Sequence, residues 1–172
     1  MKDTLDHELK AICSFDLSAI FQDLTGSVAF TAVFREYGDY PADHWYNEFC
    51  KDYIRGFTLQ DDGKLQLLGS KELFGCSTAY QTYKDREKRD YQKAKVAFQT
   101  KGEIELGKML TSRNLIRQLG SQPRWIQSDE TPNVKDIRFI GQMDSGRWIE
   151  DGPYLFLFID PENKILYQVE QF

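Results

Sequence analysis

Several stretches of the chain alternate apolar with small or polar side chains, which is the pattern of a strand with one buried face. Residues 26–38 follow this pattern, with Gly26 and Gly38 marking its two ends. The sequence DDGKLQLLGS indicates a turn and a short strand, and DIRFIGQM indicates a further strand. The last part of the chain predicts a hairpin that turns at DPEN, where the proline suits the second position of the turn. Because residues 154–159 are continuously apolar, we expect the first strand of this hairpin to be covered on both faces.

The clearest predicted helix covers residues 39–57. Trp45, Phe49 and Tyr53 repeat every four residues there and form one aromatic stripe along the helix. Gly56 then supplies the left-handed stop.

Three other segments also predict helices. The longest runs from about Tyr80 to Phe98, with aromatic residues on one side and the charged sequence KDREKRDYQKAK on the other. Shorter helices are predicted at 3–12 and 105–120. Together these elements predict one α+β domain over residues 1–172, in which a largely antiparallel sheet with a C-terminal β-hairpin is packed by three to four helices.

The length and composition are those of a single folded domain. At 172 residues the chain can bury enough surface to fold without disulfides or metals. No stretch approaches the roughly 20 apolar residues of a membrane span, and the start MKDTLDHELKA lacks the apolar region of a secretory signal. The three cysteines have no CxxC spacing, so we expect reduced thiols in a cytoplasmic protein.

Charge is unevenly distributed along the chain. Residues 1–62 contain five Lys or Arg and twelve Asp or Glu, a balance of −7, whereas the remainder carries +2. An acidic half disfavours nucleic acid as a partner, since phosphate contacts need clustered Lys and Arg. It favours a basic protein partner instead, and the alternative is a solvated acidic surface with no partner.

No residues form a catalytic or metal-binding pattern. The chain has two histidines, and His44 and Cys50 would lie on different sides of one helix. The histidines and cysteines also lack the short spacing of zinc ligands. We therefore expect no enzyme activity, no metal and no cofactor.

The segment QPRWIQSDETPNVKDIRFIGQMDSG has a different character. Trp125 lies between Pro123 and Pro132, and proline favours rigid, extended backbone. The Trp125 side chain is therefore expected either to pack into the core at a sheet edge or to lie at the centre of a surface that contacts a partner. Gln127 and Gln142 can each donate and accept hydrogen bonds, which suits recognition rather than catalysis.

This segment resembles the C-terminal part of the YwqG-like family of uncharacterised bacterial proteins, and related immunity modules of toxin systems. The resemblance covers roughly residues 115–172, and these residues carry it: Pro123, Trp125, Ile126, Gln127, Asp129-Glu130-Thr131-Pro132, Phe139-Ile140-Gly141-Gln142, Asp151-Gly152 and Leu155 to Ile159. It implies binding rather than catalysis and supplies no catalytic residues.

Two functions are predicted from these observations. The first is a cytoplasmic immunity protein that neutralises a cognate bacterial toxin by occluding it, with aromatic anchors and carboxylates at the interface. The second is a small-ligand or peptide-binding module with a pocket near Trp125, Gln127, Gln142 and Trp148. The residues predicted to contact the partner in the first function are Glu36, Asp39, Asp43, His44, Glu48, Asp52, Trp125 and Trp148.

Overall fold

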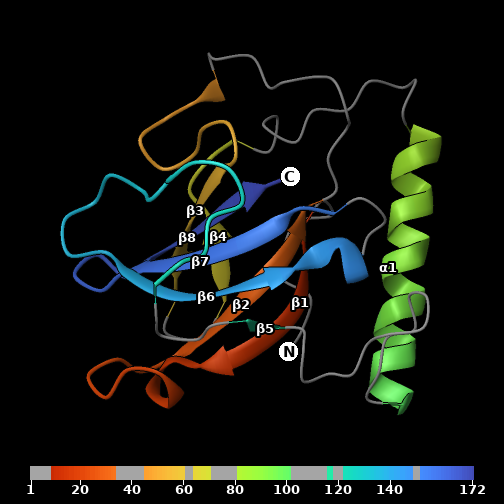
Figure 1. Cartoon of the computed structure of the whole chain (residues 1–172), viewed down its shortest axis with the longest axis horizontal. Coiled ribbons are helices and arrows are strands. Elements are labelled where there is room, and N and C mark those ends of the chain that lie inside the picture. Colours follow the sequence, from red (N-terminus) through yellow and green to blue (C-terminus); the bar gives the residue numbers. More distant parts are fainter. Residues whose placement is uncertain are drawn as a thin grey trace.

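A computed structural model gives the fold, and it describes residues 9–33, 45–60, 64–70, 81–101, 116–117, 122–148 and 152–172 (Figure 1). Its strands are β1 (Leu9–Asp16), β2 (Ser27–Val33), β3 (Ile54–Leu59), β4 (Leu65–Leu67), β5 (Ile116–Arg117), β6 (Arg138–Asp144), β7 (Tyr154–Asp160) and β8 (Ile165–Gln171). The described part of the chain holds one α-helix, α1 (Gln81–Lys101), and two short 3-10 helices, Leu17–Ala19 and Ser145–Arg147.

The strands form two antiparallel sheets. β1 and β2 pair as a two-stranded ribbon, and the other strands form a six-stranded sheet in the order β4-β3-β8-β7-β6-β5. The predicted C-terminal hairpin is confirmed as β7 and β8. Its turn is held by the Asp160 side chain, which accepts hydrogen bonds from the backbone N–H groups of Glu162 and Asn163 at 3.0 and 3.1 Å.

Helix α1 confirms the predicted long helix and lies along one side of the sheets (Figure 1). Tyr91 on its inner side is buried; its hydroxyl donates to the carbonyl of Ala11, and its ring lies 6.0 Å from that of Trp148. Within the described residues, no helix is both long and apolar enough to cross a membrane.

The six-stranded sheet carries a hydrophobic core on each face. On β7, Leu155, Leu157 and Ile159 face the β1–β2 ribbon and α1, whereas Phe156 and Phe158 point to the opposite face. Side chains alternate between the two faces of a strand, so a strand covered on both sides needs apolar residues throughout. The prediction that residues 154–159 are covered on both faces is therefore confirmed.

A buried polar contact ties the two sheets together. Gln168 of β8 accepts a hydrogen bond from the backbone N–H of Thr31 at 2.9 Å and donates to the Thr31 carbonyl at the same distance. The Thr31 hydroxyl donates to the same Gln168 oxygen at 3.1 Å. The amide side chain thus pairs with β2 as a neighbouring strand would.

The predicted α+β class is wrong, because the described structure is mostly sheet and its single α-helix replaces the three to four that were expected. The described residues 45–57 do not form the predicted helix, and Gly56 lies within β3, whereas residues 39–44 of that prediction lie outside the described structure. Asn47 accounts for the local difference, since its side chain accepts from the N–H groups of Phe49 and Cys50 and stabilises a turn.

The two shorter predicted helices are strands wherever the structure describes them. Residues 9–12 of the predicted helix 3–12 belong to β1, whose pairing with β2 outweighs local helix propensity. In the predicted helix 105–120, Ile116–Arg117 form β5, and the other positions lie outside the described residues. The predicted strands at 26–38, DDGKLQLLGS and DIRFIGQM are confirmed as β2, β4 and β6 where the structure describes them.

Candidate functional site

The segment that begins at Gln122 lies across the face of the sheet opposite the β1–β2 ribbon, with Trp125 packed on β7. The Trp125 ring stacks on Phe156 at 4.7 Å between centroids and on Phe158 at 5.9 Å. It remains partly exposed, so one side of the ring contacts the core and the rest reaches the surface.

Two glutamines of the sheet hold this segment by its backbone. Gln142 of β6, only 4% exposed, accepts from the N–H of Arg124 at 2.8 Å and donates to its carbonyl at 3.3 Å. Gln171 of β8, only 1% exposed, accepts from the N–H groups of Ile126 and Gln127 at 2.9 and 3.2 Å. It also donates to the carbonyl of Ser128 at 2.7 Å. The backbone on both sides of Trp125 is therefore fixed by buried side chains.

A β-bulge directs Gln142 toward the segment. The register of β6 with β7 shifts between Phe139 and Gly141. A bulge adds one residue to one strand, so Phe139 pairs with Phe158 and Gln142 pairs with Phe156, both on the same face of β7. Without the extra residue, positions 139 and 142 would point to opposite faces.

Beside Trp125 the surface has a hollow of about 360 Å³, which we call the aromatic hollow. Such a volume is within the range of small-ligand sites. Four aromatic rings line it, and its polar lining includes a carboxylate and a guanidinium. These aromatic and charged residues are Phe21, Trp125, Phe139, Phe158, Asp129 and Arg138.

Hydrogen bonds fix both charged groups of the aromatic hollow. The Arg138 Nη1 atom lies 2.7 Å from each carboxylate oxygen of Asp23, and the guanidinium carbon lies 5.7 Å from the Phe21 ring centroid. This contact with Arg138 lowers the pKa of Asp23. Asp129 accepts from the hydroxyl and backbone N–H of Thr131, and these two bonds lower the pKa of Asp129. The carboxylates of Asp23 and Asp129 are therefore both charged at neutral pH.

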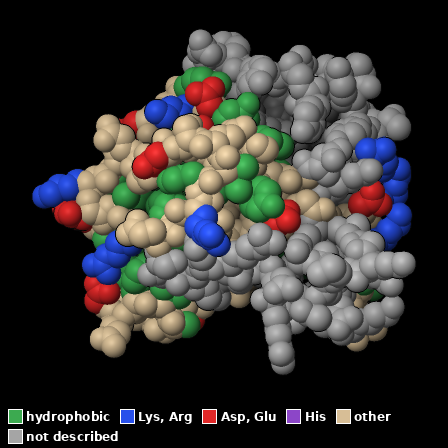
Figure 2. All heavy atoms as spheres, in the orientation of Figure 1, with side chains coloured by type: hydrophobic (Ala, Val, Ile, Leu, Met, Phe, Trp, Pro, Cys, Tyr) green, Lys and Arg blue, Asp and Glu red, His purple; other side chains and the backbone are tan. Residues whose placement is uncertain are grey.

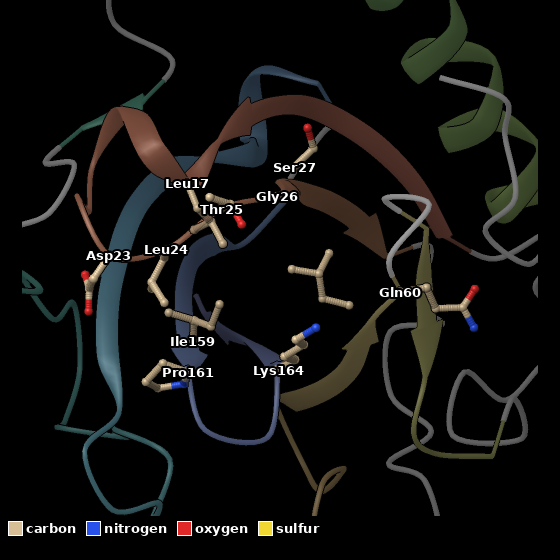
Figure 3. Close-up of a pocket in the computed structure, with 11 residues that line it drawn as sticks. Leu17, Asp23, Leu24, Thr25, Gly26, Ser27, Gln60, Ile159, Pro161 and Lys164 are labelled. Atoms are coloured by element: carbon tan, nitrogen blue, oxygen red, sulfur yellow. The ribbon is translucent and has the colours of Figure 1, made fainter.

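A second and larger hollow, of about 570 Å³, lies on the other side of the Asp23–Arg138 ion pair, and we call it the end cavity. It opens at the end of the sheets, between the β1–β2 connection, the end of β3 and the β7–β8 turn (Figure 3). Asp23 lines the end cavity and Arg138 lines the aromatic hollow, so this ion pair connects the walls of the two.

The four residues of the predicted pocket do not share one cavity. Trp125 lines the aromatic hollow, and Gln127 is exposed and donates to the carbonyl of Phe172 at 3.0 Å. Gln142 lies beneath the segment as a support. Trp148 is only 2% exposed and belongs to the core on the opposite face of the sheet. Placed there, Trp148 has almost no surface to offer a ligand or a protein partner, which corrects its predicted role as a contact.

The predicted acidic contact region is only partly described. Glu36, Asp39, Asp43 and His44 lie outside the described residues. Glu48 and Asp52 are exposed, and Asp52 accepts a hydrogen bond from the Tyr46 hydroxyl at 2.7 Å. On the described part of the face in Figure 2, positive and negative side chains are interspersed.

The sequence did not single out Gln171, Phe21 or Arg138 as parts of a site. Arg138 and its partner Asp23 are 115 positions apart, and Gln171 is 45 positions from Ile126. The sequence gives no distinct signal for Gln171, because β8 also carries the polar residues Gln168 and Glu170; only its burial in the fold shows that its amide needs a hydrogen-bonding partner.

Groups suited to metal binding do not cluster in the described part of the chain. No three His, Cys, Asp or Glu residues within it lie close enough together to hold a metal ion. Cys50 is fully buried, and this burial raises the pKa of its thiol. Its sulfur accepts a hydrogen bond from the N–H of Gly56 at 3.4 Å, so the thiol serves the fold locally.

Comparisons of the chain with protein-family models, with curated proteins and with solved structures find no match. The resemblance to the YwqG-like family therefore stays a prediction.

Proposed function

We propose that this protein is a non-catalytic binding module, and that the aromatic hollow receives a peptide or another small ligand. The observation that carries the proposal is the position of Trp125, which has one side stacked on β7 and also lines an open hollow. A large aromatic side chain held in this way offers contact area at little conformational cost.

The lining favours a ligand that combines an apolar group with polar ends. The aromatic rings offer surface to an aliphatic or aromatic side chain. Asp129 and Arg138 lie among them with opposite charges, so the polar groups of a peptide backbone can find both an acceptor and a donor. Because Gln142 and Gln171 already hold the segment, binding requires little ordering of the protein.

Selection from a random peptide library displayed on phage tests this proposal. We expect enriched peptides to share an apolar residue, and calorimetry to show weaker binding to Asp129→Asn, which removes a charge from the lining. Asp136→Asn is the matched control, since Asp136 is exposed, has a positive φ of 56° that asparagine tolerates, and does not line the hollow. Peptides that bind both variants as well as the wild type would show that the aromatic hollow is not the site.

A second candidate function is the immunity protein predicted from the sequence, which would occlude a cognate toxin in the cytoplasm. Trp45 favours it, because this large side chain is 38% exposed and lies in the same loop as the exposed Glu48 and Asp52. Exposed aromatic residues next to carboxylates suit a basic protein surface.

The toxin encoded beside the gene is the partner with which to test this candidate. If the second function holds, Trp45→Ala and Glu48→Gln weaken the complex, whereas Asp129→Asn leaves its affinity unchanged. The reverse pattern assigns the partner to the aromatic hollow instead. If the adjacent gene product does not bind, the candidate is refuted.

A further inference from the structure

The two charged groups that line the aromatic hollow differ in what already lies beside them. We propose that the apolar group received by the hollow carries a positive charge, so that the hollow selects an alkylated ammonium ion. This inference deepens the function proposed above and rests on it, because the ligand enters the same hollow.

The positive charge of the lining is already balanced by a neighbour. Arg138 and Asp129 are the charged residues among the described residues that line the hollow. The Nη1 atom of Arg138 lies 2.7 Å from each carboxylate oxygen of Asp23, so this ion pair adds little net charge to the hollow. The carboxylate of Asp129 is then the charge that a ligand meets. It attracts a cation in the hollow and repels an anion.

Asp129 keeps one carboxylate oxygen for a ligand. The backbone N–H and the hydroxyl of Thr131 both donate to its Oδ1 atom, at 2.9 and 2.6 Å. Within the described part of the chain, the Oδ2 atom of Asp129 accepts no hydrogen bond. The two bonds from Thr131 also fix the direction of this exposed carboxylate, so a cation can approach it without a rearrangement of the protein.

The aromatic rings favour the same sign of charge. The face of an aromatic ring carries negative partial charge and attracts cations, most strongly for tryptophan. Trp125 stacks one side of its ring on Phe156 and Phe158 and remains partly exposed, so the rest of the ring is available to a ligand. A cation already lies over another ring of the hollow, since the guanidinium carbon of Arg138 is 5.7 Å from the centroid of Phe21. Alkyl groups on a ligand nitrogen gain apolar contact with these rings as well.

A cation and its uncharged isostere provide the test. Choline is compared with the alcohol in which carbon replaces the choline nitrogen, and with tert-butylacetate as an anion of similar shape. The indole N–H resonance of Trp125 in NMR spectra reports binding to the hollow. We expect choline to bind at least about threefold more tightly than the alcohol, because an exposed ring and an exposed carboxylate each contribute modestly, and the anion to bind more weakly than the alcohol.

A second ligand distinguishes two sources of the ammonium group. Trimethyllysine with blocked termini carries the same head as choline, but on a peptide side chain. If it binds more tightly than choline, the ligand is a peptide, and if it binds more weakly, the ligand is a free small molecule. Either order supports the proposal, provided that both cations bind more tightly than the uncharged alcohol.

One pair of variants isolates the charge of the lining. Asp129→Asn removes the charge and keeps a side-chain oxygen that can accept from Thr131. It should weaken choline binding about two- to fivefold, the usual size for an exposed ion pair, and leave binding of the alcohol unchanged. Asp136→Asn, at an exposed position outside the lining, is the matched control and should change neither.

Equal binding of the alcohol and choline, with a shift of Trp125 in both titrations, would overturn the selection of an ammonium ion and leave the hollow as a ligand site. An equal effect of Asp129→Asn on both ligands would overturn it too, as would choline that fails to bind or that binds without a shift of Trp125. The proposed function itself fails on a different result, in which neither the uncharged alcohol nor any selected peptide shifts Trp125.

Discussion

Substitution of Gln171 by leucine tests whether buried side chains hold the segment around Trp125. The change keeps the size of the side chain but removes three hydrogen bonds, those with Ile126 N–H, Gln127 N–H and the Ser128 carbonyl. Each such bond contributes about 0.5–1.5 kcal/mol net. Because Ile126 and its neighbours are exposed, water can replace part of this loss.

We therefore expect Gln171→Leu to lower the free energy of unfolding by about 2 kcal/mol, within the range that these bonds allow. Urea unfolding measures this change. Gln92→Leu is the control, because Gln92 is an exposed residue of α1, and such a substitution changes stability by less than about 0.5 kcal/mol.

Amide hydrogen exchange gives the local result. In the wild type, the N–H groups of Ile126 and Gln127 should be protected, and in Gln171→Leu they should exchange at least tenfold faster, since about 1.4 kcal/mol corresponds to a factor of ten. Unchanged exchange at both amides, together with unchanged stability, would refute the reasoning that Gln171 holds the segment.

Three further predictions concern the fold. Gly56→Ala should destabilise the protein by about 1–3 kcal/mol in urea unfolding, because the new Cβ would lie 2.9 Å from the Cβ and the carbonyl oxygen of Phe49; an unchanged midpoint contradicts this packing. Arg138 holds the pKa of Asp23 below its ordinary value of 3.8, so their ion pair stabilises the fold above that pH, and the contribution disappears as the pH falls through the lower pKa of the folded state. Asp23→Asn should accordingly be less stable than the wild type at neutral pH, with a difference that shrinks in unfolding curves recorded below pH 3.8; a difference independent of pH would exclude the ion pair as its cause. Burial raises the pKa of the Cys50 thiol, so iodoacetamide should alkylate this residue much more slowly in the folded protein than in urea, as measured by peptide mass spectrometry, and equal rates would place the thiol at the surface.

The C-terminal third of the fold could be predicted because its local signals agree with its tertiary environment. Residues 154–159 are apolar on both faces, and β7 is in fact buried on both faces. The turn sequence DPEN places Asp160 where its carboxylate can accept from the following N–H groups. Pattern and turn chemistry therefore lead to the same hairpin.

The helix predicted at 39–57 fails for a reason that periodicity cannot reveal. Phe49 packs on one face of the six-stranded sheet, and Cys50 is buried beside Gly56. The Asn47 side chain accepts from the N–H groups of both residues and so stabilises a turn there. Aromatic residues at helical spacing thus meet different neighbours in a folded loop. The turn at Asn47 and the pairing of β3 with β8 and β4 together decide between the two structures.

Only part of the candidate site could be predicted from the sequence. Trp125 stood out because of its flanking prolines, and Gln142 because a polar amide ends an apolar stretch. The hollow is completed by Phe21, which follows β1, and by Phe158 of β7, and the topology brings these distant parts of the chain together. The face of the sheet to which Gln142 points also depends on the β-bulge in β6, and the pattern of apolar and polar residues does not predict this bulge.

Fluorine NMR of protein labelled with fluorotryptophan tests most directly whether Trp125 is the centre of a binding site. The chain has three tryptophans, which lie in the aromatic hollow, in an exposed loop and in the core. On titration with a selected peptide, the Trp125 resonance should shift and saturate, and those of Trp45 and Trp148 should stay in place. A shift of Trp45 with Trp125 unmoved would contradict the assignment of binding to the aromatic hollow.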